Sequence, residues 1–165
     1  MIIQKLTIKD LEMFKNIRLE ALELEPQAFG DSFSVLSKKK DNYWKKELSN
    51  KWKNWYGVFD NNELVGIGSI KFAKSLKFNH IAHLSGIYVK KAQRGKGIGK
   101  LLFKTRIDEA FKNEKIKKLK LIVNTSQTNA ISLYESFNFR EVGKLEAEFR
   151  LDDTFYDAIL MELVR

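Results

Sequence analysis

The chain has 165 residues, no cysteine and a net charge of +9. This length suits one domain spanning residues 1–165, and the 44% of hydrophobic residues predict a packed core rather than disorder. The missing cysteines exclude disulfides, thiolate metal sites and a cysteinyl acyl-enzyme, and with only His80 and His83 no metal site is expected. No apolar run approaches the ~20 residues that cross a bilayer, so we expect a soluble, cytoplasmic protein without a membrane partner.

Periodicity and turn residues predict alternating helices and strands along the whole chain. Asp10 is the expected N-cap of the first helix, and Asn61-Asn62 is the expected turn of a hairpin. The strands are predicted at 2–8, 55–59, 64–72, 81–89, 119–123, 139–149 and 155–164, and the helices at 10–22, 41–49, 97–113 and 127–137.

The segment Gln93-Arg94-Gly95-Lys96-Gly97-Ile98-Gly99-Lys100 lies between the strand predicted at 81–89 and the helix that follows. Glycines let a backbone approach a ligand closely, and free amides at a helix N-terminus favour an anion. The segment therefore predicts a site for the phosphates of a cofactor. A P-loop would need a glycine at Arg94 and a hydroxyl at Leu101, and the glycine spacing is not that of a dinucleotide-binding turn.

The spacing that fits is Arg-x-x-Gly-x-Gly, filled by Arg94, Gly97 and Gly99. It resembles the acetyl-coenzyme A signature of the GNAT superfamily of N-acetyltransferases. The segment from Asn129 to Phe139 resembles a second motif of that family, with Tyr134 in the tyrosine position and Asn138 where a glycine is usual. Because asparagine tolerates the left-handed conformation best after glycine, this departure leaves the assignment intact.

The resemblance covers the chain and implies an α/β fold, the GNAT N-acyltransferase fold, with a central twisted mixed sheet and helices on both faces. It implies acetyl-CoA as the cofactor, with coenzyme A as product. Strand backbone would pair with the pantetheine, the turn amides would hold the pyrophosphate, and Asn129 would touch the cofactor nearby. The expected cofactor-binding residues are Ile87, Tyr88, Val89, Arg94, Gly95, Lys96, Gly97, Ile98, Gly99, Lys100 and Asn129, with Asn124 as a weaker candidate.

Tyr134 and His83 are the candidate catalytic residues under this resemblance. A phenol near the sulfur can protonate the leaving thiolate, and Tyr134 is therefore expected to be the general acid. The attacking amine must lose a proton, and His83, in the strand beside the turn, is the candidate base, with a water chain as the alternative. Periodicity alone would instead make Tyr134 a core residue of its helix, and His83 a core or edge residue. A bulge near Gly86 would change which face His83 shares with Ile87 and Val89.

Basic residues are concentrated in the middle of the chain, where residues 71–124 hold 15 basic and 3 acidic residues. Such a basic stripe could bind nucleic acid, but no nucleic-acid-binding motif accompanies it. The excess of positive charge surrounds the turn where a coenzyme's phosphates would bind. Nucleic acid is therefore not an expected partner. A module of this fold that binds acyl-CoA without turnover is the alternative function, although such a module would have no use for an acid at Tyr134.

The acceptor is expected to be a primary amine of a small molecule or peptide, attacking directly in a ternary complex. In the family the acceptor site is lined by the segment between the first helices and by the last hairpin. Acidic residues in both places would suit a cationic amine such as a polyamine, an aminoglycoside or a peptide N-terminus, or they form ordinary solvated surface. These residues are Glu20, Glu23, Glu25, Asp31, Glu146, Glu148, Asp152 and Asp153. Relatives are often dimers, so a homodimer through the last strands is one arrangement that the resemblance allows.

Overall fold

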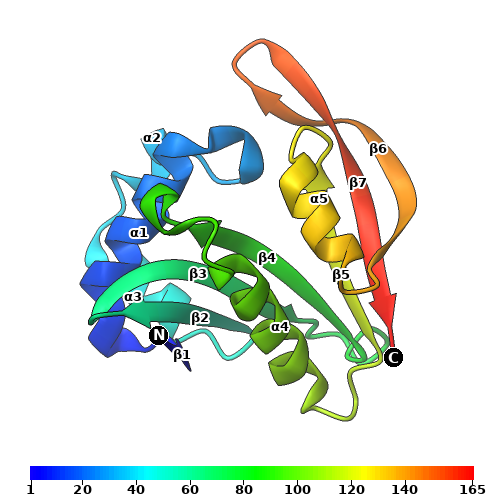
Figure 1. Cartoon of the computed structure of the whole chain (residues 1–165), viewed down its shortest axis with the longest axis horizontal. Helices are drawn as coiled ribbons and strands as arrows, with labels where there is room; N and C mark the ends of the chain where they lie inside the picture. The colour runs from blue at the N-terminus through cyan, green and yellow to red at the C-terminus, as the bar shows by residue number, and fades with distance from the viewer.

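The computed structural model describes residues 1–165 and contains a seven-stranded sheet in the order β1-β2-β3-β4-β5-β7-β6 (Figure 1). Only β4 and β5 are parallel, and all other neighbours are antiparallel, so the sheet is mixed, as predicted. The strands are β1 (Ile2–Lys5), β2 (Lys53–Asp60), β3 (Glu63–Phe72), β4 (Ile81–Val89), β5 (Lys118–Asn124), β6 (Arg140–Leu151) and β7 (Thr154–Val164). The helices are α1 (Leu11–Leu24), α2 (Phe33–Leu36), α3 (Asp41–Leu48), α4 (Ile98–Phe111) and α5 (Thr128–Glu135).

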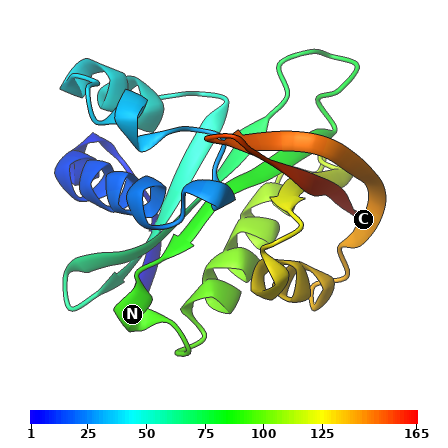
Figure 2. The ribbon, with the colours of Figure 1, turned by 90° about the horizontal axis from the view of Figure 1, so that it is seen from above.

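Helices cover both faces of the sheet, with α1 to α3 on one side and α4 and α5 on the other (Figure 2). Two hydrophobic clusters follow this division. One joins α1 and α3 to the sheet around Phe14, Trp44 and Trp55, and the other packs α4 and α5 on the opposite face around Phe103 and Tyr134. Burial of these apolar side chains on both faces is what holds the layers together.

Most predicted elements are present within a few residues of their predicted ends. The short helix α2 was not predicted, because four residues carry no measurable periodicity. Asp10 precedes α1 as predicted, but its carboxylate does not cap that helix. It accepts the Thr7 amide at 2.7 Å and closes a capping box around the single 3-10 turn before α1.

Two asparagine predictions are confirmed by the backbone. Asn61 and Asn62, between β2 and β3, have φ of +48° and +64°, the left-handed conformation that a tight hairpin turn requires. Asn138, after α5, has φ of +63° and so occupies the left-handed position where a glycine is usual. None of the helices combines the length and apolarity that a membrane crossing requires.

Strands β4 and β5 separate soon after they begin. Their pairing runs only from Ile81 opposite Lys118 to His83 opposite Lys120, so from Leu84 onward β4 has no partner on that side. On its other side β4 pairs with β3, with a bulge at Gly86, whose φ is +65°. The bulge reverses the alternation as anticipated: Leu84 and Ile87 pack with the α4 cluster, whereas Tyr88 packs with the α1 cluster. A wedge-shaped opening between β4 and β5 results, and it positions the candidate site.

Candidate active site

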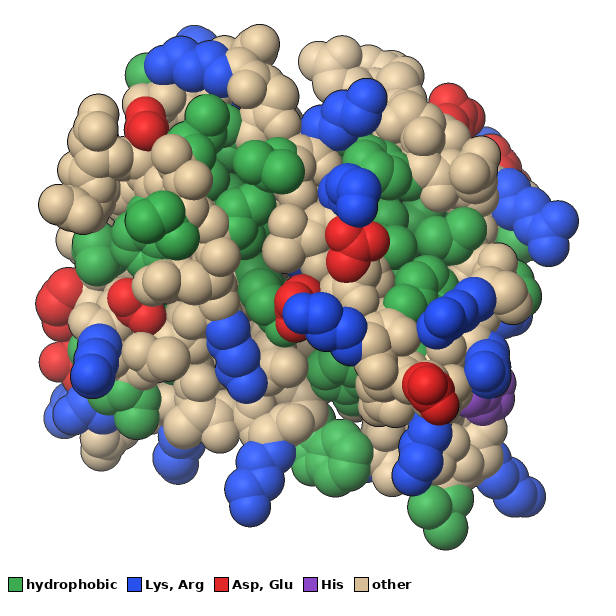
Figure 3. Space-filling view, turned by 60° about the horizontal axis from the view of Figure 1, so that its bottom comes forward, with side chains coloured by type: hydrophobic (Ala, Val, Ile, Leu, Met, Phe, Trp, Pro, Cys, Tyr) green, Lys and Arg blue, Asp and Glu red, His purple; other side chains and the backbone are tan.

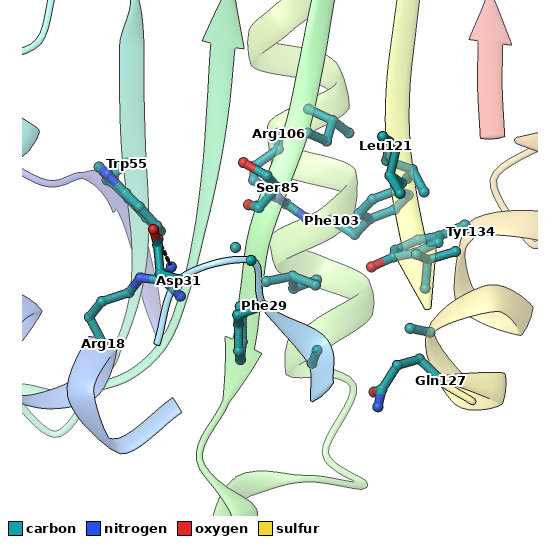
Figure 4. A pocket seen from close by; sticks show the side chains of 18 of the residues that line it. Arg18, Phe29, Asp31, Trp55, Ser85, Phe103, Arg106, Leu121, Gln127 and Tyr134 are labelled. Atoms are coloured by element: carbon teal, nitrogen blue, oxygen red, sulfur yellow. Dashed lines mark hydrogen bonds and ion pairs between the residues drawn. The ribbon is translucent and has the colours of Figure 1, made fainter. Parts of the chain in front are cut away.

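An inner cavity of about 250 Å³ lies where β4 and β5 separate (Figure 4). Its walls come from distant segments: β2, β4 and β5, α4 and α5, the middle of α1, the segment before α2, and Phe149 of β6. The side chains that matter for its chemistry are Arg18, Phe29, Asp31, Lys53, Trp55, Ser85, Arg106, Gln127 and Tyr134.

An outer groove of about 510 Å³ adjoins the inner cavity, and the two share Ala28, Phe29, Ile87, Gln127 and Ala130 as lining residues. Nine of the eleven predicted cofactor-binding residues line this groove. They are Ile87, Tyr88, Val89, Arg94, Gly95, Gly97, Ile98, Gly99 and Asn129. Lys96 and Lys100 are exposed beside it and are not part of its lining.

The glycine turn has the geometry of an anion site. Gly95 and Gly97 have φ of +79° and +76°, and a β-carbon at either position would extend into open space. The first hydrogen bond of α4 is donated by the Leu101 amide to the Gly97 carbonyl, so the amides from Gly95 to Lys100 have no backbone acceptor. Free amides at the positive end of a 14-residue helix suit a phosphate group. The turn therefore fits the pyrophosphate of a coenzyme.

Arg94 braces the turn rather than presenting a free charge. Its Nε donates to the Val89 carbonyl at 3.0 Å, and its Nη2 lies 2.9 Å from the Glu25 carboxylate. The guanidinium also lies over the Tyr88 ring, whose hydroxyl donates to Glu20 at 2.8 Å. Together these contacts tie the turn to β4 and to the end of α1.

Tyr134 contributes its side chain to the inner cavity from α5 (Figure 4). The residue is only 6% exposed, and its ring packs against Phe103 at a centroid distance of 4.8 Å. Burial raises the pKa of the phenol, and the positive charge of Arg106 opposes that rise. The phenol is therefore protonated at neutral pH and can donate a hydrogen bond or a proton within the cavity.

Arg106 lies in the wall of the cavity beneath β4. It is 1% exposed, and its Nη1 donates to the carbonyls of Ser69 and Ser85 at 3.2 and 3.1 Å. The guanidinium occupies space left by Gly68, where a β-carbon would lie 2.8 Å from its central carbon. Burial lowers the pKa of Arg106 to about 10, which leaves it charged at neutral pH.

Arg18 and Asp31 form an ion pair on the opposite wall, with Nη2 of Arg18 2.7 Å from the carboxylate (Figure 4). The guanidinium stacks on the rings of Phe29 and Trp55, at 4.8 and 5.5 Å from their centroids. Asp31 remains half-exposed at the cavity. It is the one carboxylate in the cavity lining.

The structure does not bring His83 to this site. His83 is an exposed residue at the paired end of β4 and lines neither the cavity nor the groove. In the register it lies opposite Lys71 on one side and Lys120 on the other. Partial desolvation there, followed by the charges of Lys120 and Lys71, lowers the pKa of the imidazole. The ring is thus neutral at neutral pH, but the geometry gives the proposed role of base no support.

Most of the acidic residues expected at the acceptor site also lie elsewhere. Of the eight, only Asp31 lines the inner cavity, and Glu25 lines the outer groove beside Arg94. The last hairpin contributes an aromatic ring, Phe149, instead of a carboxylate. Asn124 is buried and donates to the Gln27 carbonyl at 3.1 Å, a structural role.

Arg18 and Arg106 were not singled out from the sequence. A signal for both exists, because each stands within the apolar stripe of an amphipathic helix. Arg18 follows Ile17 and precedes Ala21, and Arg106 stands between Phe103 and Ile107. A charged residue at such a position is buried and therefore needs a partner or a function.

Comparison with known proteins agrees with this arrangement. The acetyltransferase (GNAT) family matches residues 17–139 of the chain. No protein of curated function matches the sequence. Among solved structures, an acetyltransferase of the GNAT family from Streptococcus pneumoniae is similar at a TM-score of 0.85 with 24% identity, covering 99% of both chains. A ribosomal-protein-alanine N-acetyltransferase from Brucella melitensis is similar at 0.85 with 23% identity over 100% of both.

A chimeric spermidine N-acetyltransferase from Vibrio cholerae and hSSAT is similar at a TM-score of 0.76, with 22% identity over 99% of this chain and 96% of that one. At these identities the structures establish the shared fold. The family match spans most of the chain, and the chain therefore belongs to the GNAT family of acetyltransferases. It is an enzyme of that class, and the class uses acetyl-CoA.

Proposed function

We propose that the protein transfers the acetyl group of acetyl-CoA to a primary amine of a small molecule or peptide, by direct attack in a ternary complex. The observation that carries this proposal is the placement of Tyr134. Its phenol lies in an inner cavity continuous with a groove formed by the glycine turn. The chain has no cysteine that could carry the acetyl group as an intermediate.

The groove residues would hold the coenzyme in an extended conformation. The amides of Gly95 to Lys100 would bind the pyrophosphate, with Lys96 and Lys100 adding positive charge. The edge of β4 that lacks a partner after Leu84 offers the backbone of Ile87 and Val89 to the pantetheine amides, as an added strand would pair. Asn129 lines the same groove. Bound acetyl-CoA supplies an acetyl thioester, which is reactive toward amines.

Tyr134 would act as the general acid. Its phenol donates a proton to the sulfur as the leaving group departs, which avoids releasing a free thiolate into a poorly solvated cavity. Burial alone would make the phenol a weaker acid, and the charge of Arg106 partly offsets this effect. Arg106 therefore supports proton donation without needing to touch the reacting atoms.

Asp31 would orient the acceptor amine, because it is the one carboxylate of the cavity lining. A carboxylate can accept hydrogen bonds from an ammonium group and hold that group in place while the ammonium loses one proton to water. The acidic residues of the sequence suggest a cationic acceptor such as a polyamine. In the cavity a polyamine would meet only one carboxylate, that of Asp31, which is already paired with Arg18.

The first experiment measures thiol release from acetyl-CoA with polyamines, aminoglycosides, amino acids and short peptides. Wild type and Tyr134→Phe are assayed together. Loss of the acid should lower kcat by about 10²-fold, within the range typical of general acid catalysis. Tyr43→Phe is the matched control, because Tyr43 packs on Trp44 in α3, away from the cavity, and should retain kcat.

Acetyl-CoA binding without turnover of any acceptor would instead support a module that binds acyl-CoA without catalysis. Turnover that Tyr134→Phe leaves unchanged would support the enzyme and reject Tyr134 as its acid. The two parts of the proposal are thus tested separately.

A further inference from the structure

The charged side chains that line the inner cavity are mostly basic. Arg18, Lys53 and Arg106 line it, against Asp31 alone. Lys53 pairs with Glu47 at 2.8 Å, but Glu47 is not part of the lining. An acceptor that enters this cavity therefore meets an excess of positive charge, which is the opposite of what a polyamine would require.

Arg106 contributes a positive charge with no counter-ion. No carboxylate pairs with it, its Nε has no hydrogen-bond partner, and the residue is 1% exposed. The bare backbone of Gly68 leaves room for the guanidinium, whose Nη1 bridges two carbonyls of neighbouring strands. A buried and uncompensated charge lowers stability unless another group neutralises it. The fold thus maintains an unpaired cation in the wall of the acceptor cavity.

Arg18, on the other wall, is a second buried arginine whose hydrogen-bond donors are only partly paired. Its Nη2 pairs with Asp31, but its Nη1 is buried without a hydrogen-bond partner, and the residue is 5% exposed. Phe29 and Trp55 hold the guanidinium in place by stacking on it. Two guanidinium charges held rigidly in the walls of one small cavity favour an anionic group, such as a carboxylate, in the molecule that enters it.

We propose that the acceptor is an amine that also carries a carboxylate, of which an amino acid is the smallest example. The inference rests on the proposed acetyl transfer and specifies its substrate class. The carboxylate is attracted by Arg18 and Arg106, while the amine lies toward Asp31 and the cavity face of Tyr134. The cavity, of about 250 Å³, limits the acceptor to a small molecule, or admits only the end of a larger one.

The test compares acceptors in pairs that differ only in the carboxylate. Amino acids are assayed against their amides. A peptide beginning with Asp or Glu is assayed against the same peptide beginning with Asn or Gln, and spermidine serves as the polyamine. The kcat/KM of each carboxylate should exceed that of its partner by about tenfold or more, which corresponds to ~1.4 kcal/mol. Preference in the free amino acids identifies a small-molecule acceptor, and preference confined to the peptides identifies an acidic peptide.

Arg18→Met then removes one of the two charges. The ratio between carboxylate and amide should fall toward one. Lys15→Met is the matched control on the same helix, since Lys15 pairs with Asp41 outside the cavity, and this variant should keep the ratio. The KM for acetyl-CoA, which depends on the outer groove and not on a lining that contains Arg18 or Arg106, reports whether each variant is folded.

The outcomes separate this inference from the proposed function. Faster acetylation of amides or of spermidine than of carboxylates would overturn the inference and leave acetyl transfer in place. An unchanged ratio in both Arg18→Met and Arg106→Met would also overturn it. No acetyl transfer to any acceptor would reject the proposed function itself.

Discussion

Tyr134 combines two environments, because its ring is buried against Phe103 while its hydroxyl shares the cavity with Arg106. Burial raises the pKa of the phenol above its ordinary value of about 10. A raised pKa keeps the acid protonated as pH rises, so its ionisation should not lower activity in the neutral range. We therefore expect kcat at saturating substrate to show no Tyr134-dependent decline between pH 7 and about 10.

The measurement is the pH profile of kcat for wild type and Tyr134→Phe. A decline with an apparent pKa near 8 that is present in wild type and missing in the phenylalanine variant would contradict the prediction. It would show that Arg106 outweighs burial and lowers the phenol pKa.

His83 has the chemistry of a general base but does not lie at the site. Its imidazole is neutral at neutral pH because its pKa is lowered, so it could accept a proton if it reached the amine. It lies outside the cavity lining, however, on a surface between two lysines. We expect His83→Gln to retain kcat within about twofold and to keep the pH profile between 6 and 8. A loss of tenfold or more, with a shifted profile, would restore His83 as the base.

The residues of the site differ in how far the sequence could locate them. Tyr134 and the glycine turn belong to short motifs whose spacing is visible in the chain. Arg106 acquires its role from Gly68 and Ser85, which are 38 and 21 positions away and meet it only after the sheet has formed. Asp31 could be suggested by its charge, but only its contact with Arg18 places it in the cavity.

The N-terminus of α4 depends on a left-handed backbone conformation at Gly97, its N-cap residue. Gly97 has φ of +76° and a β-carbon there would point into open space, so Gly97→Ala meets no protein atom but adopts a strained conformation. The strain should cost about 1–2 kcal/mol. A chain of this length loses ~2–4 °C in Tm for each kcal/mol. The added methyl should also keep phosphate away from the turn and raise the KM for acetyl-CoA.

Gly143→Ala is the matched control for this prediction. Gly143, in β6, also has open space around a β-carbon, but it has no positive φ and lies outside the groove. Its substitution should leave the KM for acetyl-CoA unchanged. An unchanged KM in Gly97→Ala, with only the Tm lowered, would mean that the cofactor does not approach the turn.

At the scale of elements, periodicity was sufficient where segments are long and amphipathic. The ends of β4 were predicted to the residue, and the left-handed positions of Asn61 and Asn138 followed from residue type. What the sequence could not specify is how far β4 and β5 stay paired. The point where the two strands separate is reached only in the folded sheet, where contacts join residues far apart in the chain, such as Asn124 with Gln27. The inner cavity exists because the strands separate, so its lining could not be predicted in full.

For the whole molecule, the two faces of the sheet have separate roles. The cluster around α4 and α5 carries Tyr134 and the glycine turn, and the cluster around α1 and α3 supports Arg18 and Asp31. The cavity lies where both meet, with β4 as the shared wall. A change on the α1 side should therefore alter acceptor choice. A change on the α4 side should alter cofactor binding and the chemical step, and at Arg106 it should alter acceptor choice as well.

The net charge of +9 is a property of the whole molecule that should affect the rate of cofactor capture. Lysine and arginine side chains outnumber acidic ones over the face shown in Figure 3. A positive surface attracts a polyanion over distances up to the Debye length, about 10 Å at 0.1 M salt and 3 Å at 1 M. We expect kcat/KM for acetyl-CoA to fall several-fold between 0.05 and 0.5 M NaCl, with kcat nearly constant.

Two double variants distinguish charge at the turn from total charge. Lys96→Gln with Lys100→Gln removes two exposed charges beside the groove, and Lys38→Gln with Lys40→Gln removes two exposed charges between α2 and α3. Both pairs lower the net charge equally. If the turn captures the phosphates, the first pair should lower kcat/KM at low salt and flatten its salt dependence, and the second should do neither. Equal effects from both pairs would mean that the overall field, and not the turn, draws in the cofactor.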